Sequence, residues 1–154
     1  MKQENTIDTI SAHKIKLRLL TVDDYDDIIL IQLDSFPEMK PWKREQWKKV
    51  IHTFPEGQIG IEVDGELAAS SCSLLLNFDE FGKHHSWMDI TGNGTLSTHH
   101  KKGETLYGIE IMVSQKFRGM RLARRLYDER KQLAINMNLK RIIVGGRLPN
   151  YHLY

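Results

Sequence analysis

Arginine gathers in one short stretch of the chain, beside Gly119. The residues concerned are Arg118, Arg121, Arg124 and Arg125. The hydrophobic pattern after them predicts a helix, so these arginines lie at its amino-terminal end. That end carries the positive pole of the helix dipole and unpaired backbone N–H groups, and an exposed cation there costs about 0.3–1 kcal/mol. Free N–H groups and several guanidinium groups beside a glycine indicate a site for a polyanion, most simply a phosphate or pyrophosphate.

A second interpretation of the same arginines requires no ligand. Asp128 and Glu129 come next at helical spacing and would partly neutralise a solvated basic face. We favour the anion site, because ordinary helices place Asp or Glu, not Arg, in the first turn. The two interpretations differ in whether the arginines pair with the chain's own carboxylates.

Two predicted strands flank this helix. Residues 106–113 alternate between two faces, of which one holds Ile109, Ile111 and Val113 and the other holds Gly108, Glu110 and Met112. The helix is indicated by a stripe of Leu122, Leu126, Leu133, Ala134 and Met137, with Asn138 as its left-handed stop. Residues 141–146 have the composition of a buried strand. A strand, helix and strand of these lengths form a βαβ unit with parallel strands and a right-handed crossover.

Residues 113–123 resemble the acetyl-CoA-binding segment of the GCN5-related N-acetyltransferases (the GNAT superfamily). In that family a Gln/Arg-x-x-Gly-x-Gly/Ala loop between the fourth strand and the third helix wraps the pyrophosphate of the cofactor. The loop is matched here by Arg118, Gly119, Met120, Leu122 and Ala123. Arg121 stands where the family has its inner glycine, and this departure affects one backbone contact, because glycine permits the closest approach.

Longer runs of the chain, 106–113, 118–127 and 145–151, are similar to acetyltransferase domains that precede a carbon–nitrogen hydrolase (nitrilase-like) domain in longer bacterial proteins. The resemblance implies an α/β (α+β) fold with a mixed central sheet in the order β-α-α-β-β-β-α-β. It also implies that the last helix and strands of the fold are missing after Tyr154. We therefore expect residues 1–154 to form a single domain, the amino-terminal fragment of a longer protein.

The resemblance implies an activity as well, in which an amine attacks the thioester of acetyl-CoA directly. The acceptor would be a small-molecule or peptide amine. The cofactor-binding residues implied are Ile111, Met112, Val113, Arg118, Gly119, Met120, Arg121, Leu122, Ala123 and Arg124. Backbone groups of the strand would hold the pantetheine, and preorganised N–H groups would stabilise negative charge on the attacked carbonyl oxygen.

Glu110 is the nearest carboxylate on the strand, and we assign it as the base that takes the proton of the amine, directly or through water. This role requires burial to raise the pKa of Glu110. The alternative is that Glu110 is a structural partner for one of the arginines. The family often takes its general acid from a tyrosine in a later helix. We do not transfer that role to Tyr151 or Tyr154, and Tyr127 belongs to the earlier helix.

The composition limits other functions. A chain of 154 residues has room for one domain with a sizeable core, and 40% hydrophobic and 27% charged residues are ordinary for a globular protein. The net charge is only +2, so the arginine cluster is a local feature and no nucleic-acid partner is expected. No apolar run is long enough to span a membrane, and the chain begins with no signal peptide. Cys72 is the single cysteine, which excludes an internal disulfide and favours the cytoplasm.

The first half of the chain predicts elements in the family's usual order. Strands are expected at 15–20, 58–63 and 66–77, and helices from Tyr25 through Leu33 and at 42–52. Thr21 and Asp24 form a capping signal for the first helix, and an Asp-Gly pair between the last two strands forms a tight turn. Trp42 and Trp47 are expected to pack in the core or at its rim rather than to line an acceptor groove.

The polar stretch 79–104 is predicted to be a long loop that covers the acceptor end of the cleft. Residues 87–92 and His99 resemble the hydrolase-linked acetyltransferases and are expected to shape that pocket. Four histidines, His84, His85, His99 and His100, suggest a zinc site. No cysteine accompanies them and no spacing defines a tetrahedral site, so we assign no metal.

Two other functional classes stay open. The first is a catalytically weak acyl-CoA-binding or regulatory module attached to a nitrilase-like amidohydrolase, which the missing end of the fold and Arg121 favour. The second is a nucleic-acid binder that uses the arginine cluster, which the near-neutral charge and the lack of interleaved aromatic residues disfavour. A homodimer is an assembly that the sequence allows.

Overall fold

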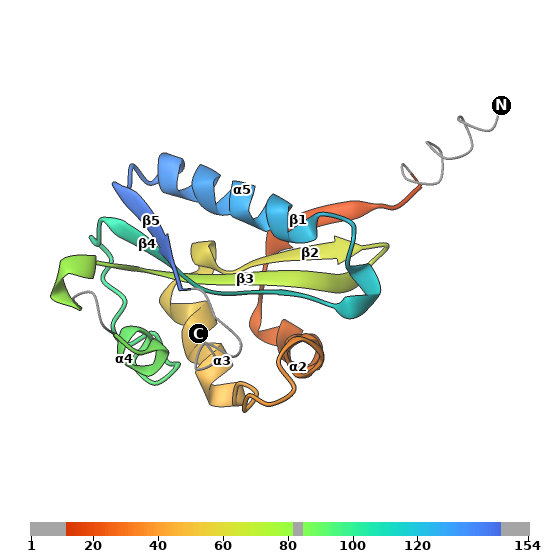
Figure 1. The fold of residues 1–154 in the computed structure, drawn as a ribbon, viewed down its shortest axis with the longest axis horizontal. Coiled ribbons are helices and arrows are strands. Elements are labelled where there is room, and N and C mark those ends of the chain that lie inside the picture. Colours follow the sequence, from red (N-terminus) through yellow and green to blue (C-terminus); the bar gives the residue numbers. More distant parts are fainter. Residues whose placement is uncertain (1–11, 82–84, 146–154) are drawn as a thin grey trace, which may run out of the picture.

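The computed structural model describes residues 12–81 and 85–145 of the chain. At its centre is a five-stranded mixed sheet whose strands lie side by side in sequence order (Figure 1). The strands are β1 (Ile15–Leu19), β2 (Ile59–Val63), β3 (Glu66–Leu76), β4 (Thr105–Val113) and β5 (Arg141–Val144). The first four pair antiparallel, and β5 pairs parallel to β4 because a helix carries the chain back between them. The predicted mixed sheet is confirmed.

Helices cover both faces of the sheet. α2 (Tyr25–Ser35) and α3 (Arg44–Thr53) lie on one face, and α5 (Leu122–Asn136) lies on the other (Figure 1). Trp47 and Ile28 anchor the apolar cluster under α2 and α3, and Leu126 anchors the cluster under the start of α5. Four single 3₁₀ turns complete the described part: η1 (Val22–Asp24), η2 (Pro55–Gly57), η3 (Phe78–Glu80) and η4 (Gln115–Phe117). In this part of the chain no helix is long and apolar enough to cross a membrane.

Local signals in the sequence set the element boundaries. The hydroxyl oxygen of Thr21 accepts a hydrogen bond from the N–H of Asp23, and the carboxylate of Asp24 accepts one from the N–H of Thr21. At the turn between β2 and β3, Asp64 has φ +51° and Gly65 has φ +85°, the left-handed pair that a two-residue hairpin requires. The predicted order of strands and helices is confirmed.

The stretch 79–104 is not the plain loop that the sequence predicted. It contains a short helix, α4 (Trp87–Thr91), on the same side of the sheet as α3 (Figure 1). Ser86 and Asp89 cap its start reciprocally, and Gly92 with φ +60° ends it. Five residues are too few to show a hydrophobic period, which is why the pattern missed this helix. His84 lies outside the described residues.

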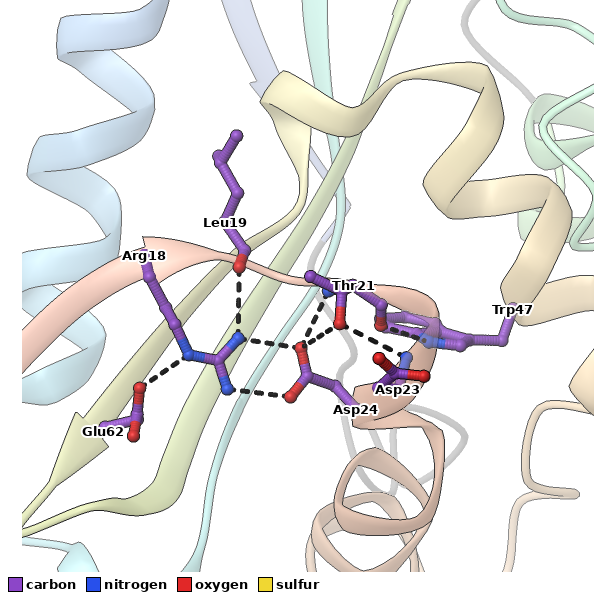
Figure 2. Close-up of polar contacts among 7 residues, drawn as sticks. All are labelled: Arg18, Leu19, Thr21, Asp23, Asp24, Trp47 and Glu62. Carbon is purple, nitrogen blue, oxygen red and sulfur yellow. Dashed lines mark hydrogen bonds and ion pairs between the residues drawn. The ribbon is translucent and has the colours of Figure 1, made fainter.

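A partly buried ion-pair network joins β1 to the helical layer (Figure 2). Arg18 donates two hydrogen bonds of 2.8 Å to the carboxylate of Asp24 and one of 2.6 Å to Glu62 on β2. The indole N–H of Trp47 on α3 donates to the carbonyl of Thr21 over 3.0 Å. Burial alone would raise the pKa of Asp24, but the hydrogen bonds from Arg18 and Thr21 lower it overall. The network holds the start of α2 and the helix α3 against the sheet.

We expect Asp24→Asn to lower the free energy of unfolding by about 1–3 kcal/mol, because it removes the charge that pairs with Arg18. Since the pKa of Asp24 is lowered in the folded state, this contribution should be present at neutral pH and should be lost as the pH falls through the lowered pKa. Urea denaturation at neutral and acidic pH measures both effects. Asp23→Asn is the matched control, because Asp23 is exposed and makes no ion pair within the described residues. Equal losses in the two variants would contradict this assignment.

Candidate active site

The turn that joins β4 to α5, residues 114–121 (the elbow), has an unusual backbone. Gly119 has φ +88°, and Arg121, the cap residue of α5, has φ +58°. This range of φ is open to glycine and strained for a residue with a side chain. Arg121 therefore keeps the left-handed conformation that glycine favours, although its side chain departs from the family's motif.

The elbow and the first turn of α5 present a run of unused backbone donors. Within the described residues, the N–H groups from Gly119 through Arg124 have no hydrogen-bond partner. The next N–H group, that of Arg125, donates to the carbonyl of Arg121 over 3.2 Å. These unused donors lie at the positive pole of the helix dipole.

The side chains of the elbow add formal charge to this pole. All four arginines, Arg118, Arg121, Arg124 and Arg125, are exposed, and none forms an ion pair within the described residues. Asp128 and Glu129 are also exposed and pair with none of them. The arginines are therefore solvated, as the second interpretation expects, but no direct pairing with these two carboxylates occupies them, and their charge is available to an anion.

β4 and β5 separate part-way along β4. Pairing with β5 covers Thr105 to Gly108, and among the described strands β4 has no neighbour on that side beyond Gly108. A pocket of about 560 Å³ (the edge pocket) lies along this open edge. Its lining includes Ile109 and Ile111 of β4, Tyr127 of α5 and Gly145 after β5.

A β-bulge interrupts β4 where β5 stops pairing. Cys72 of β3 lies opposite Glu110, whereas the next residue of β3, Ser73, lies opposite Gly108. Ile109 is therefore an extra residue in β4 with no partner of its own. Bulges bend a strand and redirect its side chains, and here the redirected residues are Ile109 and Glu110.

The bulge breaks the alternation that the sequence predicted. Ile109 packs with Met112 in the cluster on the α2–α3 face, whereas Ile111 and Val113 pack in the cluster on the α5 face. The prediction that Ile109 shares a face with Ile111 and Val113 is wrong, because one extra residue shifts a period of two. The side chain of Glu110 lies beside Trp42, on the α2–α3 side.

A buried arginine holds the bulge from the α5 side. The guanidinium group of Arg130, which is 2% exposed, donates to the carbonyls of Cys72 and Glu110 over 2.8 Å each and to the hydroxyl of Ser73 over 3.2 Å. A bulge deprives nearby carbonyls of ladder partners, and Arg130 supplies donors to them. Gly108 leaves the necessary room, since a Cβ atom there would lie 2.5 Å from Nη1 of Arg130. Burial lowers the pKa of Arg130.

Glu110 is a carboxyl group of the cleft whose pKa is shifted toward neutral pH. Burial raises its pKa to about 7, although a hydrogen bond from the Trp42 side chain and the charge of Arg130 act in the opposite direction. Its Oε1 atom is closed to solvent and has no hydrogen-bond partner within the described residues. Arg130 meets the carbonyl of Glu110 rather than its carboxylate, so the contact between them is not a side-chain ion pair. A carboxylate with this pKa can take and release a proton near neutral pH.

A second pocket of about 480 Å³ (the tryptophan pocket) adjoins the edge pocket at Glu110. Its walls, between the α2–α3 connection and α4, include Met39, Trp42, Trp87 and Met88. The N–H of Trp42 donates to Oε1 of Gln32, and its carbonyl accepts from the hydroxyl of Tyr25, each over 2.7 Å. Trp47 packs in the core, as predicted. For Trp42 the prediction is wrong in part, because its ring packs in the core and also lines this pocket.

The described histidines of residues 79–104 were considered as zinc ligands, but two of them make other contacts. Within the described residues no three His, Cys, Asp or Glu side chains converge on a metal position. His85 lines the edge pocket, with Nε2 3.1 Å from the hydroxyl of Tyr107. His99 accepts a hydrogen bond from the N–H of Leu75 and stacks on Phe54, so it packs against β3 rather than shaping either pocket. The helix α4 does line the tryptophan pocket, as expected for this stretch.

Comparison with known proteins shows the family to which this chain belongs. The model of the acetyltransferase (GNAT) family matches residues 25–154. The chain belongs to the GNAT acetyltransferase family. An uncharacterized N-acetyltransferase of Bacillus subtilis (strain 168), YkwB, is 30% identical over 158 residues, which cover 100% of this chain and 70% of YkwB.

Two further comparisons concern a longer relative and a solved structure. A probable hydrolase of the same Bacillus subtilis strain, YhcX, is 49% identical over 141 residues, and the match covers 92% of this chain but only 28% of YhcX. The loading GNATL domain of CurA from Lyngbya majuscula superposes with a TM-score of 0.78 at 15% identity, over 92% of this chain and 69% of that one. At that identity the likeness shows the fold alone. The predicted N-acetyltransferase domain with acetyl-CoA as cosubstrate is confirmed at the level of the family.

Some of the predicted cofactor-binding residues have buried side chains, and others have exposed ones. The side chains of Met112 and Leu122 are buried in the two cores, so only their backbone groups can meet a ligand. Gly119 and the exposed arginines offer both N–H groups and charge. Tyr151 and Tyr154 lie outside the described residues. Cys72 is buried, as predicted, and burial raises the pKa of its thiol.

Arg130 is the site residue that sequence reasoning missed. A signal was present, because Leu122, Leu126, Arg130 and Ala134 recur at every fourth position of α5 and all are buried. A charged residue in the middle of an apolar stripe indicates a buried partner. Its acceptors could not be read from the sequence, since they are backbone carbonyls and a hydroxyl of strands brought together by the sheet.

We expect Arg130→Met to lower the free energy of unfolding by about 1–3 kcal/mol, because one buried and one partly buried carbonyl lose their donor. Loss of the positive charge should also raise the pKa of Glu110, since Arg130 lowers it in the native protein. Urea denaturation and carboxyl titration by NMR measure the two effects. Lys131→Met is the matched control, an exposed cation on the next position of the same helix. The same stability and the same Glu110 titration in both variants would rule out this role for Arg130.

Proposed function

We propose that this GNAT domain transfers the acetyl group of acetyl-CoA to an amine, which attacks the thioester carbonyl directly. One observation carries the proposal: Glu110, a half-buried residue whose Oε1 atom is closed to solvent and whose pKa is raised to about 7, lies where the edge pocket and the tryptophan pocket meet. Two reactants can reach the same carboxylate from different pockets. Holding them side by side supplies much of the rate advantage of such an enzyme.

The elbow is assigned to the pyrophosphate of acetyl-CoA, and the open edge of β4 is assigned to the pantetheine and the thioester. Unused N–H groups and exposed guanidinium groups at a helix start suit an anion in charge and in geometry. The residues assigned to acetyl-CoA are Ile111, Met112, Val113, Arg118, Gly119, Met120, Arg121, Leu122, Ala123 and Arg124. Their order along the chain leads from the open edge of β4 to the phosphate site at the elbow.

Glu110 is assigned as the general base. The nitrogen of the amine forms a bond to the acetyl carbon, the carbon–sulfur bond breaks, and coenzyme A leaves as the thiolate. Glu110 takes the proton that the nitrogen loses, directly or through one water molecule. Backbone N–H groups at the open edge of β4 would stabilise the negative charge that develops on the carbonyl oxygen, because they are already oriented before the reaction.

We infer that residues 1–154 form one domain of a longer cytoplasmic protein, followed by a nitrilase-like domain. The support is YhcX, which is named a probable hydrolase and of which this chain covers 28%. The acceptor would be a small-molecule or peptide amine, and the proposal is compatible with a homodimer. A second candidate is a catalytically weak acyl-CoA-binding module that regulates an attached amidohydrolase.

With the full-length protein and a weakly basic amine, kcat/KM should rise with pH and level off above about pH 7, because Glu110 must be ionised to accept a proton. Glu110→Gln should lower kcat about a hundredfold and abolish this inflection. Release of free thiol measures the rate. Glu104→Gln, an exposed carboxylate just before β4, is the control and should keep the wild-type profile. Coenzyme A binding without turnover, unaffected by Glu110→Gln, would favour the regulatory module instead.

Arg118→Ala and Arg124→Ala should each weaken acetyl-CoA binding about tenfold, since each removes a charge-assisted contact to phosphate. Folding should be little affected, because both side chains are exposed. Calorimetry on the full-length protein measures the affinities, with Lys131→Ala as the exposed control on α5. A parallel titration with dephospho-CoA shows whether either arginine meets the ribose phosphate. Unchanged affinity in both variants would exclude the elbow as the cofactor site.

A further inference from the structure

The tryptophan pocket bears on the identity of the amine, provided that acetyl transfer takes place at Glu110 as proposed above. Its volume of about 480 Å³ lies in the range of small-molecule sites. The ring centroids of Trp42 and Trp87 are 6.3 Å apart, and their planes meet at 75°. Met39, Pro41 and Met88 extend this apolar surface. An occupant of the pocket must therefore carry an apolar body, for which a single aromatic ring is well suited.

One wall of this pocket is held rigidly. Trp42 is tied to Gln32 and to Tyr25 through its backbone, and its ring packs edge-on against Trp47, which is fully buried. Trp87 on α4 is only half-buried and faces Trp42. A rigid aromatic wall favours one orientation of a flat ligand, since little side-chain entropy is lost when the ligand binds.

The charges around the pocket are distributed unequally. Glu110 is the only acidic residue in the described lining, and its Oε1 atom is buried without a partner. Lys40 and Lys43 belong to the same lining but are exposed, and neither forms an ion pair within the described residues. One carboxylate can orient one ammonium group, whereas the two lysines repel a second cation and attract an anion. The arrangement is unsuited to a polyamine.

We propose that the acceptor is a primary amine with an apolar, ring-sized body and a carboxylate remote from the amine. The amine meets the carboxyl group of Glu110 at the buried end, the body lies against the exposed faces of Trp42 and Trp87, and the acceptor's own carboxylate reaches Lys40 and Lys43 at the exposed end. This describes an ω-amino acid with a hydrophobic spacer. A neutral arylalkylamine lacks the anion, and a polyamine or an amino sugar lacks the apolar body.

The test compares matched probes on the full-length protein with saturating acetyl-CoA. The probes are 4-(aminomethyl)benzoate, 4-(aminomethyl)benzamide, spermidine and glucosamine. The benzoate should exceed its amide in kcat/KM by about three- to tenfold, chiefly through KM, because the two differ only in the charge that meets the lysines. Spermidine and glucosamine should be poorer still.

A pair of double variants isolates the role of the lysines. Lys40→Ala with Lys43→Ala should remove the preference for the benzoate over the amide. Lys48→Ala with Lys49→Ala, which removes two exposed lysines of α3 outside the pocket lining, should keep the preference. Loss of the preference in both double variants would show that it reflects only the overall charge of the protein, and would overturn the proposal.

A binding measurement tests the proposed acceptor without depending on acetyl transfer. Quenching of tryptophan fluorescence by each probe, with coenzyme A present, reports occupancy of the pocket without requiring turnover. Tighter binding of the benzoate than of the amide supports the inference whether or not acetylation occurs. Acetylation of spermidine or glucosamine ahead of the benzoate would overturn the inference while leaving the proposed function intact. Equal binding of the two matched probes would also overturn it.

Discussion

The extra residue in β4 is the constraint on which the rest of the site depends. In a regular strand Gly108 and Glu110 would point to the same face, and Glu110 would lie under α5. The bulge at Ile109 places Glu110 on the α2–α3 side instead, next to Trp42. Pairing with β5 ends at Gly108, so the open edge and the carboxylate begin at the same point of β4. One irregularity thus brings together the cleft and the group that acts in it.

Arg130 supports the bulge, because its guanidinium group donates to the carbonyls of Cys72 and Glu110 on the two strands that meet there. Desolvation of a guanidinium group is costly, and the three acceptors that it meets offset that cost. The elbow arginines are the opposite case, since they remain hydrated and unpaired within the described residues. The same residue type therefore supports the backbone in one place and supplies an electrostatic field in the other.

The position of Glu110 also has a cost in stability. Its carboxyl group ionises near pH 4.5 when unfolded and at about pH 7 when folded, so the unfolded state binds fewer protons between these values. The cost is absent below the lower value, grows between the two, and is complete above about pH 7, where it amounts to about 3 kcal/mol. The network of Arg18 and Asp24 acts in the opposite sense, because the pKa of Asp24 is lowered and its contribution persists at neutral pH. The ion pair of Asp24 therefore stabilises the fold at neutral pH, whereas the desolvation of Glu110 destabilises it.

The sequence by itself determined the order of elements, the elbow and the family. These depend on contacts between residues near in the chain: hydrophobic periods, the capping signal at Thr21, and the run from Arg118 to Ala123. The sequence also allowed Glu110 to be selected as the candidate base, because it lies on the strand that leads to the elbow. A five-residue helix such as α4 escaped it, since so short a segment shows no period.

Only the tertiary structure decided the bulge, the depth of Glu110 and the role of Arg130. Each depends on how β3, β4 and α5 meet, and hydrophobic alternation carries no trace of one extra residue in a strand. The pKa of Glu110 is likewise a property of its surroundings, because burial raises it while Trp42 and Arg130, distant in sequence, lower it. Local patterns could therefore identify the carboxylate, but its protonation near neutral pH results from desolvation, which exists only once the chain has folded around it.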